Sequence, residues 1–478
     1  MGKNGQDYRS IVLPIEKEGV ALAMKRKAIA LTIIVAFLCS LAFLTINVES
    51  AKAITIGSNG SISGTDKLRC DGNVYTLTGN IVYTIRVDKS NVVLDGAGFT
   101  LEGNPIEGNG AGLIILPGVD EVTIKNFKIK GFGSGITLKG SGNTVTGCTI
   151  TDCFTGIWLN EATGNTISGN VLLNDNAGIQ IRYSSNNVFR NNRFENSSIS
   201  TGTDDNFNDI DPSNTIDGKP IYYLVNQKGL VINPTDYPEI GYLALVNCTC
   251  MTVKDLRISG SPANGNGIIL RYTTNSTIIH NSLTNLWSGI YSYNSYNNTI
   301  TENYISNNTQ SGIAISATIA NTITRNNIEN NKVGISLMGS AQIIYHNNFV
   351  NNTLQVDSAN WHPLNRLPMP YGMHVWDNGY PSGGNFWSDY NTTDSNNDGI
   401  ADTAYVINQY RNNTDHYPLA KPINDIPEFP KEENSSGVDT PQFPTAALAI
   451  ATLSALAVAI GLIIVFFKKN TVIKQSCK

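Results

Sequence analysis

Apolar and polar residues alternate along most of the chain in short runs rich in β-branched residues. The stretches NTVTGCTITDCFTGIWLNEAT from Asn143, NTISGNVLLNDNAGIQIRYSS from Asn165 and NTITENYISNNTQSGIAISAT from Asn298 each hold three such runs, separated by polar corners. Alternation within a run is the period of a strand with one buried face. Because the runs are too short for helices, this self-similarity predicts an all-β fold. We expect a right-handed parallel β-helix, a solenoid with coils of about 22 residues.

Three columns of residues recur in register from coil to coil. Asn and Gly tolerate the left-handed backbone that a tight corner needs, and Asn amides stacked at the strand spacing of about 4.8 Å can form hydrogen-bonded ladders. The first Asn column is Asn170, Asn192, Asn281, Asn303, Asn326 and Asn347. The second is Asn174, Asn196, Asn285, Asn307, Asn330 and Asn351. The Gly column is Gly135, Gly156, Gly178, Gly267, Gly289, Gly312 and Gly334.

The repeat and its interruptions divide the chain into parts. We expect the β-helix over 54–360, with an irregular segment at 199–238 where Pro, Asp and Tyr break the pattern. Repeat arrays need capped ends, and 361–422, which lacks the repeat and contains Trp361, Trp376 and Trp387, is the expected C-terminal cap. Residues 423–444, rich in Pro, Glu and Ser, are the expected stalk.

Two apolar segments predict the location of the chain. Residues 28–48 follow Lys25-Arg26-Lys27 and precede Ala51-Lys52-Ala53, so 1–53 reads as an n-region and signal peptide, with Met24 as a possible true start; an uncleaved anchor is the alternative. Residues 445–467 are 23 residues without a charge, long enough for a transmembrane helix. Lys468-Lys469 then favour a cytoplasmic tail at 468–478 and an extracellular or periplasmic location for the rest.

Composition narrows the partners. Charged residues make up 15% and the net charge is −5, so nothing favours nucleic-acid binding. Cys148 and Cys153 either pair outside the cell or stay neighbouring core thiols. Ten Asn-x-Ser/Thr sequons make glycosylation possible, although we expect those at Asn196, Asn307 and Asn351 to be bound in a ladder.

The strand after each Gly of the column presents two side chains outward in each coil. Exposed Trp and Tyr beside Arg, Asn and Gln suit sugars, whose apolar faces stack on rings while their hydroxyls bond to polar groups. The alternative is an ordinary solvent-facing surface. A glycosidase needs a pair of carboxylates, and the outward columns contain none; Asp152, Glu161 and Asp175 lie at corners. The carbohydrate-binding candidates are Trp158, Asn160, Gln180, Arg182, Arg271, Tyr291 and Tyr293.

Alternating oxygen ligands within 394–402 resemble a calcium loop, with a Gly where the loop must turn. The alternative is an Asx-turn loop without metal. The calcium candidates, for a structural clamp on the cap, are Asp394, Asn396, Asp398, Ile400 and Asp402.

Two longer segments carry a family resemblance. DGKPIYYLVNQKGLVINPTDYPEIGYLALVNCT at 217–249 and DNGYPSGGNFWSDYNTTDSNNDGIADTAYVI at 377–407, with the repeats, resemble the NosD-like family of right-handed β-helix proteins. That family overlaps a class of carbohydrate-binding proteins and sugar hydrolases, and the tail PEFP plus an apolar segment resembles archaeal surface proteins. Because the family is tied to copper-centre assembly, the resemblance draws attention to His362, Met369, Met373 and His374 as soft ligands. A Pro-rich cap loop explains these residues equally well.

Together these features favour a non-catalytic, membrane-anchored surface protein that binds glycans or serves as a structural or interaction module of the cell envelope. A polysaccharide lyase or hydrolase is the first alternative, and a NosD-type copper-binding accessory protein is the second. The expected partners are the membrane, through the C-terminal helix, and surface glycans or envelope proteins. Structural Ca²⁺ is the one cofactor favoured, with copper secondary to it.

Overall fold

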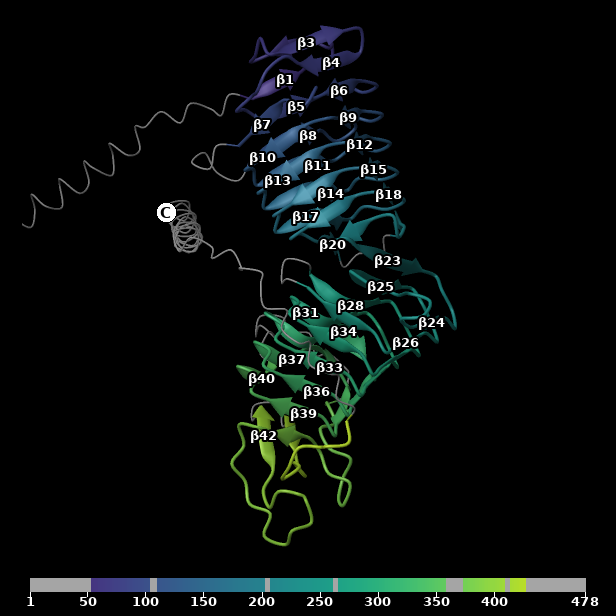
Figure 1. Ribbon diagram of the computed structural model, residues 1–478, viewed down its shortest axis with the longest axis vertical. Coiled ribbons are helices and arrows are strands. Elements are labelled where there is room, and N and C mark those ends of the chain that lie inside the picture. The colour runs from purple at the N-terminus through teal and green to yellow at the C-terminus, as the bar shows by residue number, and fades with distance from the viewer. Residues whose placement is uncertain are drawn as a thin grey trace, which may run out of the picture. The chain divides into compact units, whose positions relative to one another are not determined.

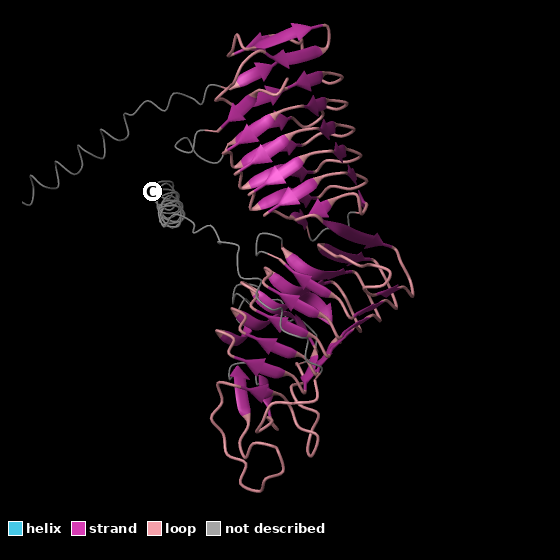
Figure 2. Ribbon diagram, in the orientation of Figure 1, coloured by secondary structure: helices cyan, strands magenta, loops and turns pink. Residues whose placement is uncertain are grey.

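The protein is a right-handed parallel β-helix, as the repeat predicted (Figures 1 and 2). The structure, a computed structural model, describes residues 53–103, 110–202, 207–260, 265–357, 373–408 and 413–426. These residues form strands joined by turns, and none of the described ones is helical. The coils fall into two runs, each with three faces, here called face 1, face 2 and face 3 in chain order.

The strands β5 to β22 of the first run form six coils, and each coil contributes three strands, one to each face. Two antiparallel partners, β2 (Ile62–Ser63) on β1 and β3 (Leu68–Asp71) on β4, close its N-terminal end. Face 1 holds β1 (Ile54–Ile56), β5 (Ile85–Val87), β8 (Ala111–Ile115), β11 (Ser134–Leu138), β14 (Thr155–Asn160), β17 (Ala177–Arg182) and β20 (Ile199–Thr201). Face 2 holds β4 (Val74–Leu77), β6 (Val93–Asp95), β9 (Thr123–Lys125), β12 (Thr144–Thr146), β15 (Thr166–Ser168), β18 (Val188–Arg190) and β21 (Asp209–Ile210). Face 3 holds β7 (Thr100–Glu102), β10 (Lys128–Lys130), β13 (Thr149–Thr151), β16 (Val171–Leu173), β19 (Arg193–Glu195) and β22 (Thr215–Ile216).

The second run repeats the same arrangement. Its face 1 holds β23 (Lys219–Val225), β25 (Tyr242–Val246), β28 (Asn266–Arg271), β31 (Ser288–Tyr293), β34 (Ser311–Ile319), β37 (Val333–Ser340) and β40 (Leu354–Asp357). Face 2 holds β24 (Val231–Ile232), β26 (Thr252–Lys254), β29 (Thr277–Ile279), β32 (Thr299–Thr301), β35 (Thr322–Thr324) and β38 (Ile343–Tyr345). Face 3 holds β27 (Arg257–Ser259), β30 (Ser282–Thr284), β33 (Tyr304–Ser306), β36 (Asn327–Glu329), β39 (Asn348–Val350) and β41 (Phe386–Trp387).

The inward side chains stack from coil to coil and form the core. Ile136 pairs in register with Ile157, and Ile157 with Ile179, and all three are fully buried. The first Asn column forms the expected buried ladders: Asn170 Nδ2 donates to Asn192 Oδ1 at 3.0 Å, and the same bond recurs through the second run. The ladder satisfies buried backbone groups at a corner that no strand pairing reaches.

The other two columns serve purposes different from those expected. The second Asn column provides the left-handed residue of the turn in each coil, with φ from 44° to 57°. The sequon residues Asn307 and Asn351 belong to this column and are exposed. The expectation that these two are bound in a ladder was therefore wrong. In that column Asn196 does donate a hydrogen bond to Asn174. The glycines of the Gly column do not have positive φ, so a left-handed backbone is not the reason for them. A Cβ on Gly289 would lie 2.8 Å from the carbonyl oxygen of Gly312, so close packing of coils explains these glycines.

The runs meet at an antiparallel turn, so the irregularity is narrower than 199–238. The described residues 199–202 and 207–216 still form strands of a coil, in which Ile199 stacks on Ile179. The chain then reverses through Asp217-Gly218, both with positive φ, and β23 pairs antiparallel with β22. On β25 the outward side chains of Tyr242, Ala244 and Val246 join the core of the first run, while Leu243 and Leu245 join that of the second. A strand buried on both faces thus joins the two cores.

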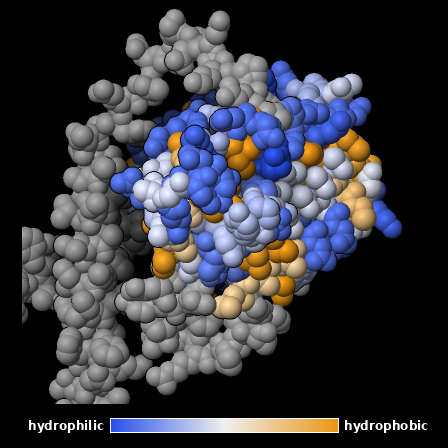
Figure 3. All heavy atoms as spheres, turned by 90° about the horizontal axis from the view of Figure 1, so that it is seen from below, coloured by the Kyte–Doolittle hydropathy of each residue, from blue (hydrophilic) through white to orange (hydrophobic). Residues whose placement is uncertain are grey.

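An aromatic layer covers the last coils of the second run. Trp387 stacks on Phe349, with ring centroids 4.4 Å apart, and Trp376 lies beside it. The antiparallel pair β42 (Tyr405–Asn408) and β43 (Asn413–Asp415) follows. Seen from this end, hydrophilic side chains cover much of the visible surface and hydrophobic ones form small groups (Figure 3). The layer shields the core end that a solenoid would otherwise expose.

Several predicted features lie outside the described residues. These are the signal peptide up to residue 52, most of the stalk, the expected transmembrane helix at 445–467, the tail, and Trp361, His362 and Met369. Among the residues that are described, no helix has the length and apolar character needed to cross a membrane. Cys148 and Cys153, which are described, are buried free thiols, and burial raises the pKa of each to about 12.

Candidate functional site

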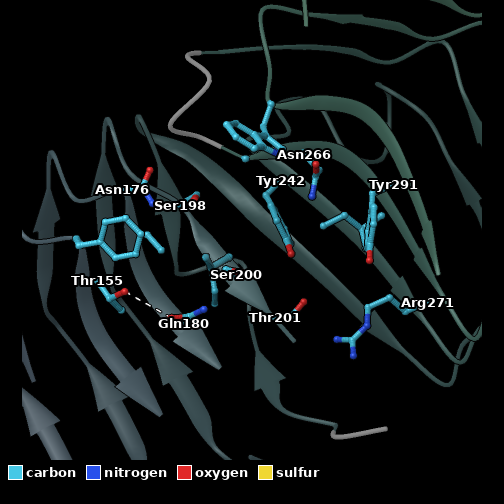
Figure 4. A pocket seen from close by; sticks show the side chains of 16 residues that line it. Thr155, Asn176, Gln180, Ser198, Ser200, Thr201, Tyr242, Asn266, Arg271 and Tyr291 are labelled. Atoms are coloured by element: carbon cyan, nitrogen blue, oxygen red, sulfur yellow. Dashed lines mark hydrogen bonds between the residues drawn. The ribbon is translucent and has the colours of Figure 1, made fainter. Parts of the chain in front are cut away.

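A cavity of about 300 Å³ lies in the corner where face 1 of the first run meets the outer surface of face 1 of the second (Figure 4). We call it the corner pocket. Its wall comes from β14, β17 and β20 on one side and β25, β28 and β31 on the other, with the turns before them. It is lined by Phe154, Thr155, Asn176, Ala177, Gln180, Ser198, Ile199, Ser200, Thr201, Tyr242, Gly265, Asn266, Ile269, Arg271, Trp287 and Tyr291.

The first run contributes small polar side chains and one exposed ring. Thr155 Oγ1 donates to Gln180 Oε1 at 3.5 Å, a long bond that leaves the Gln180 amide facing the pocket. Ser200 pairs with Gln180 in register, which places it one coil further on. Phe154 stands in the turn before β14 and is 67% exposed. The first run therefore contributes hydroxyl and amide groups to the pocket wall, together with the exposed ring of Phe154.

The second run contributes larger side chains. Strand register places Tyr291 next to Ile269, and Arg271 next to Val246. Arg271 is 3% exposed because the junction covers it. Trp287 stands in the turn before β31 and is 49% exposed. Phe154 and Trp287 thus occupy equivalent turns of the two runs, on opposite sides of the pocket.

The tyrosines of the pocket are neutral hydroxyls at physiological pH. Burial raises the pKa of Tyr242 and of Tyr291 above the usual value, and the nearby charge of Arg271 offsets only part of that rise. Both rings therefore retain a phenolic proton that can be donated. Among the described lining residues, Arg271 is the charged group and none is a carboxylate. The described lining combines ring faces with hydrogen-bond donors and acceptors, which are the groups that recognise polar ligands.

Three of the seven predicted sugar-binding residues line this pocket: Gln180, Arg271 and Tyr291. The other four are nearby but not in the lining. Trp158 lies one coil before Gln180, with a buried indole Nε1 that has no hydrogen-bond partner among the described residues, and Asn160 pairs with Arg182. The Arg182 guanidinium lies 5.1 Å from the ring centroid of Tyr183. The Tyr293 ring meets that of Tyr272 edge to face.

Sequence reasoning missed Phe154, Trp287 and Tyr242. Phe154 and Trp287 occupy corners that are otherwise polar in this chain, and an aromatic residue at such a position was the available signal. Tyr242 gave no signal, because its outward orientation follows from the antiparallel turn between the runs.

The predicted calcium loop turns its carboxylates toward its own backbone. Asp394 accepts from the backbone N–H of Asp398 and of Gly399, at 3.1 and 3.0 Å. Asp402 accepts from Thr393 Oγ1 at 2.7 Å and from Ser395. Within the described part of the chain, no group of three or more His, Cys, Asp or Glu residues converges to hold a metal. Calcium binding by this loop, Ile400 and Asn396 included, stays a prediction.

Of the predicted copper ligands, two are described. Met373 is an exposed side chain. His374 packs edge to face near Trp376, and its Nδ1 accepts from the backbone N–H of Gln342 at 3.2 Å. The other two, His362 and Met369, lie outside the described residues, so copper binding by this cluster stays a prediction.

Comparison with known proteins places two parts of the chain in family models. Residues 241–392 match the model described as periplasmic copper-binding protein (NosD), and residues 66–214 match that of a right-handed β-helix region. No curated protein sequence matches the chain significantly.

Solved β-helix structures show a weaker likeness. The A-module of a mannuronan C-5 epimerase from Azotobacter vinelandii has 16% identity, over 64% of this chain and 79% of that one, with a TM-score of 0.28. A DFA-IIIase from Arthrobacter chlorophenolicus has 14% identity over 59% and 79%, with a TM-score of 0.25. A lacto-N-biosidase from Eubacterium ramulus has 12% identity over 63% and 59%, with a TM-score of 0.26. At these scores no property of those proteins transfers to this chain.

Proposed function

Because this chain is a NosD-like right-handed parallel β-helix protein, we propose that it binds glycans outside the cytoplasm and that the corner pocket is the binding site. The observation that carries the proposal is the pairing of exposed rings with a polar interior. Phe154 and Trp287 stand at the mouth, while Gln180, Arg271 and Tyr291 lie inside. Sugars present apolar ring faces and many hydroxyls, and this pocket offers partners for both.

Binding without cleavage is the form of the proposal that the lining favours. Glycoside hydrolysis uses two carboxyl groups on either side of the scissile bond. The described lining provides tyrosine, arginine, amide and hydroxyl groups instead. We therefore assign Tyr291 and Arg271 to recognition, as donors to ligand oxygens, and Phe154 and Trp287 to stacking.

Location and anchoring belong to the same proposal. The family model that matches 241–392 describes a periplasmic protein, which supports a location outside the cytoplasm. The apolar segments at 28–48 and 445–467 support export and anchoring by a C-terminal helix. In this proposal the β-helix presents the corner pocket to glycans of the cell surface.

A glycan array probed with the full chain tests the function. We expect retention of a subset of glycans, with no new reducing ends or unsaturated sugars released during incubation. Trp287→Ala and Tyr291→Ala should each weaken the retained glycan about tenfold, which corresponds to about 1.4 kcal/mol. Tyr296→Ala is the matched control, because Tyr296 is an exposed ring of the second run outside the pocket lining. Release of product would favour the enzyme, and equal binding by all variants would exclude the corner pocket.

A further inference from the structure

The corner pocket does not end at Arg271. A second, smaller cavity of about 10 Å³ shares Thr201 and Arg271 with it and adds Tyr183, Ser184 and Asn208 to the wall. The shared residues stand at the C-terminal ends of their strands, whereas Phe154 and Trp287 stand just before the N-terminal ends. The two cavities together therefore extend along the corner from the N-terminal to the C-terminal ends of the face 1 strands.

Aromatic residues also gather at the far end of this corner. Tyr183 is 51% exposed and stacks under the Arg182 guanidinium. Tyr293, next to Arg271 in register, meets the ring of Tyr272 with centroids 5.9 Å apart. One of these clusters comes from the first run and the other from the second, as Phe154 and Trp287 do at the near end.

The backbone singles out two of these tyrosines. Tyr183 and Tyr272 have φ of 48° and 49°, in the left-handed region where a bulky side chain is a genuine outlier. The same turn position in other coils carries Glu161, Asn226, Asn247, Asn294 and Ala317. Tyrosine thus occupies an unfavourable position in one coil on each side of the junction. Strain kept at such positions is characteristic of functional sites.

We infer that the glycan site is an extended cleft and that its ligand is an oligosaccharide chain lying along the strands, across the axis of the β-helix. This inference rests on the proposed function and specifies its ligand class. The six-residue strands β17 and β28 span about 20 Å. The chain would run from Phe154 and Trp287, over Gln180 and Tyr291, to the far rim formed by Tyr183 and Tyr272.

Calorimetric titration of the full chain tests the path, with β-1,4-linked gluco- and manno-oligosaccharides and α-1,4-linked galacturono-oligosaccharides of two to eight units. For the series that binds, we expect affinity to rise with length until the cleft is filled and then to level off. Tyr183→Asn and Tyr272→Asn should each weaken the longest oligomer about tenfold and leave the shortest binding oligomer unchanged. Asn suits the left-handed turn, so both variants should fold as well as the wild type.

Ala317→Asn is the matched control, because Ala317 has φ of 51° at the same turn position of a coil away from the cleft. It should leave every affinity unchanged. Affinity independent of length, or long oligomers indifferent to both tyrosine variants, would overturn the extended cleft and leave the glycan-binding pocket standing. Absence of binding to any oligosaccharide, on the array and in all three series, would overturn both.

Discussion

The two runs of coils wind alike but fill one turn differently, namely the turn between face 3 and the next face 1. In the second run this turn holds an amide ladder over three successive coils, in which Asn308 Nδ2 donates to Asn331 Oδ1 at 2.8 Å and Asn331 Nδ2 to Asn352 Oδ1 at 3.0 Å. Leu286 occupies the position in the coil before them. In the first run the corresponding residues are Cys153, Asp175 and Ser197. Asp175 Oδ1 accepts from the Cys153 N–H at 2.8 Å, but Asp175 Oδ2 and Ser197 Oγ are buried without a partner among the described residues.

This difference shows what the fold needs and what it can leave out. Both turns have a left-handed residue followed by a small inward side chain, so the coil closes either way. The ladder adds hydrogen bonds to that minimum, each worth about 1 kcal/mol net. The incomplete column lies directly behind the corner pocket, since Asn176 and Ser198 follow Asp175 and Ser197 and line it. We therefore expect local stability to be lower beside the proposed site than in the coils that hold the ladder.

Breaking the amide ladder of the second run should have a large effect. Asn331→Ala removes the acceptor that the Asn308 backbone N–H and side-chain amide share, and the amide that donates to Ile305 O. The buried Asn308 N–H then has no side-chain acceptor. We expect the free energy of unfolding to fall by about 2–4 kcal/mol, measured by urea denaturation. Asn330→Gly is the control, because Asn330 is exposed with φ of 55° and Gly adopts that conformation readily. Equal stability of the two variants would show that the ladder contributes nothing.

A second substitution tests the close packing of coils at the Gly column, which both runs share. Ala at Gly156 or Gly289 would place a Cβ within 2.4 or 2.8 Å of the next coil's carbonyl oxygen. Each substitution should therefore cost about 1–3 kcal/mol in the same urea assay, because backbone must shift in either run. A cost in one run only would mean that the coils are spaced differently in the two.

Repairing the incomplete column should produce a smaller, opposite effect. Asp175→Asn keeps the acceptor for the Cys153 N–H and adds a donor that can reach Ile150 O, as the amide of Asn331 reaches Ile305 O. We expect a gain on the order of 1 kcal/mol at pH 4, where the carboxyl of the folded wild type is protonated, and a larger gain at pH 8. Ser200→Ala, on the outer surface of the adjacent coil, is the control for a general effect of mutation. A loss of stability in Asp175→Asn would show that the carboxyl group is better accommodated than its contacts indicate.

The pH dependence of the wild type tests the buried carboxyl group of Asp175 directly. Burial raises the pKa of Asp175 from 3.8 to about 8. As pH rises from about 4 to 8, the unfolded chain loses this proton before the folded chain does, so the unfolded state is favoured and stability falls. Thermal unfolding between pH 5 and pH 8 should show this slope in the wild type and a smaller one in Asp175→Asn. Identical slopes would contradict the raised pKa.

The sequence allowed the repeat to be predicted in detail, because stacking imposes a register that residue types must follow. Asn170 and Asn192 were correctly expected in a ladder. The Gly column was found for the wrong reason, since Gly289 is required by a neighbouring coil that lies 23 residues away and not by its own φ. Local preference alone could not separate these two causes.

The candidate site was predictable only in part. The alternation of the strands identified Gln180, Arg271 and Tyr291 as outward-facing residues. Their convergence depends on the reversal at Asp217-Gly218, which sets the outer surface of the second run against the end of the first. No periodicity encodes that reversal, so the pocket, and with it Tyr242, could not be foreseen.

Hydroxyl-radical footprinting of the full chain, with and without the tightest-binding oligosaccharide of the three series, tests the central claim most directly. The ligand should protect Phe154 and Trp287, one exposed ring from each run, while Tyr380, exposed in the cap, is oxidised as before. Saturating ligand that leaves both Phe154 and Trp287 fully reactive would contradict a glycan site between the two runs of coils.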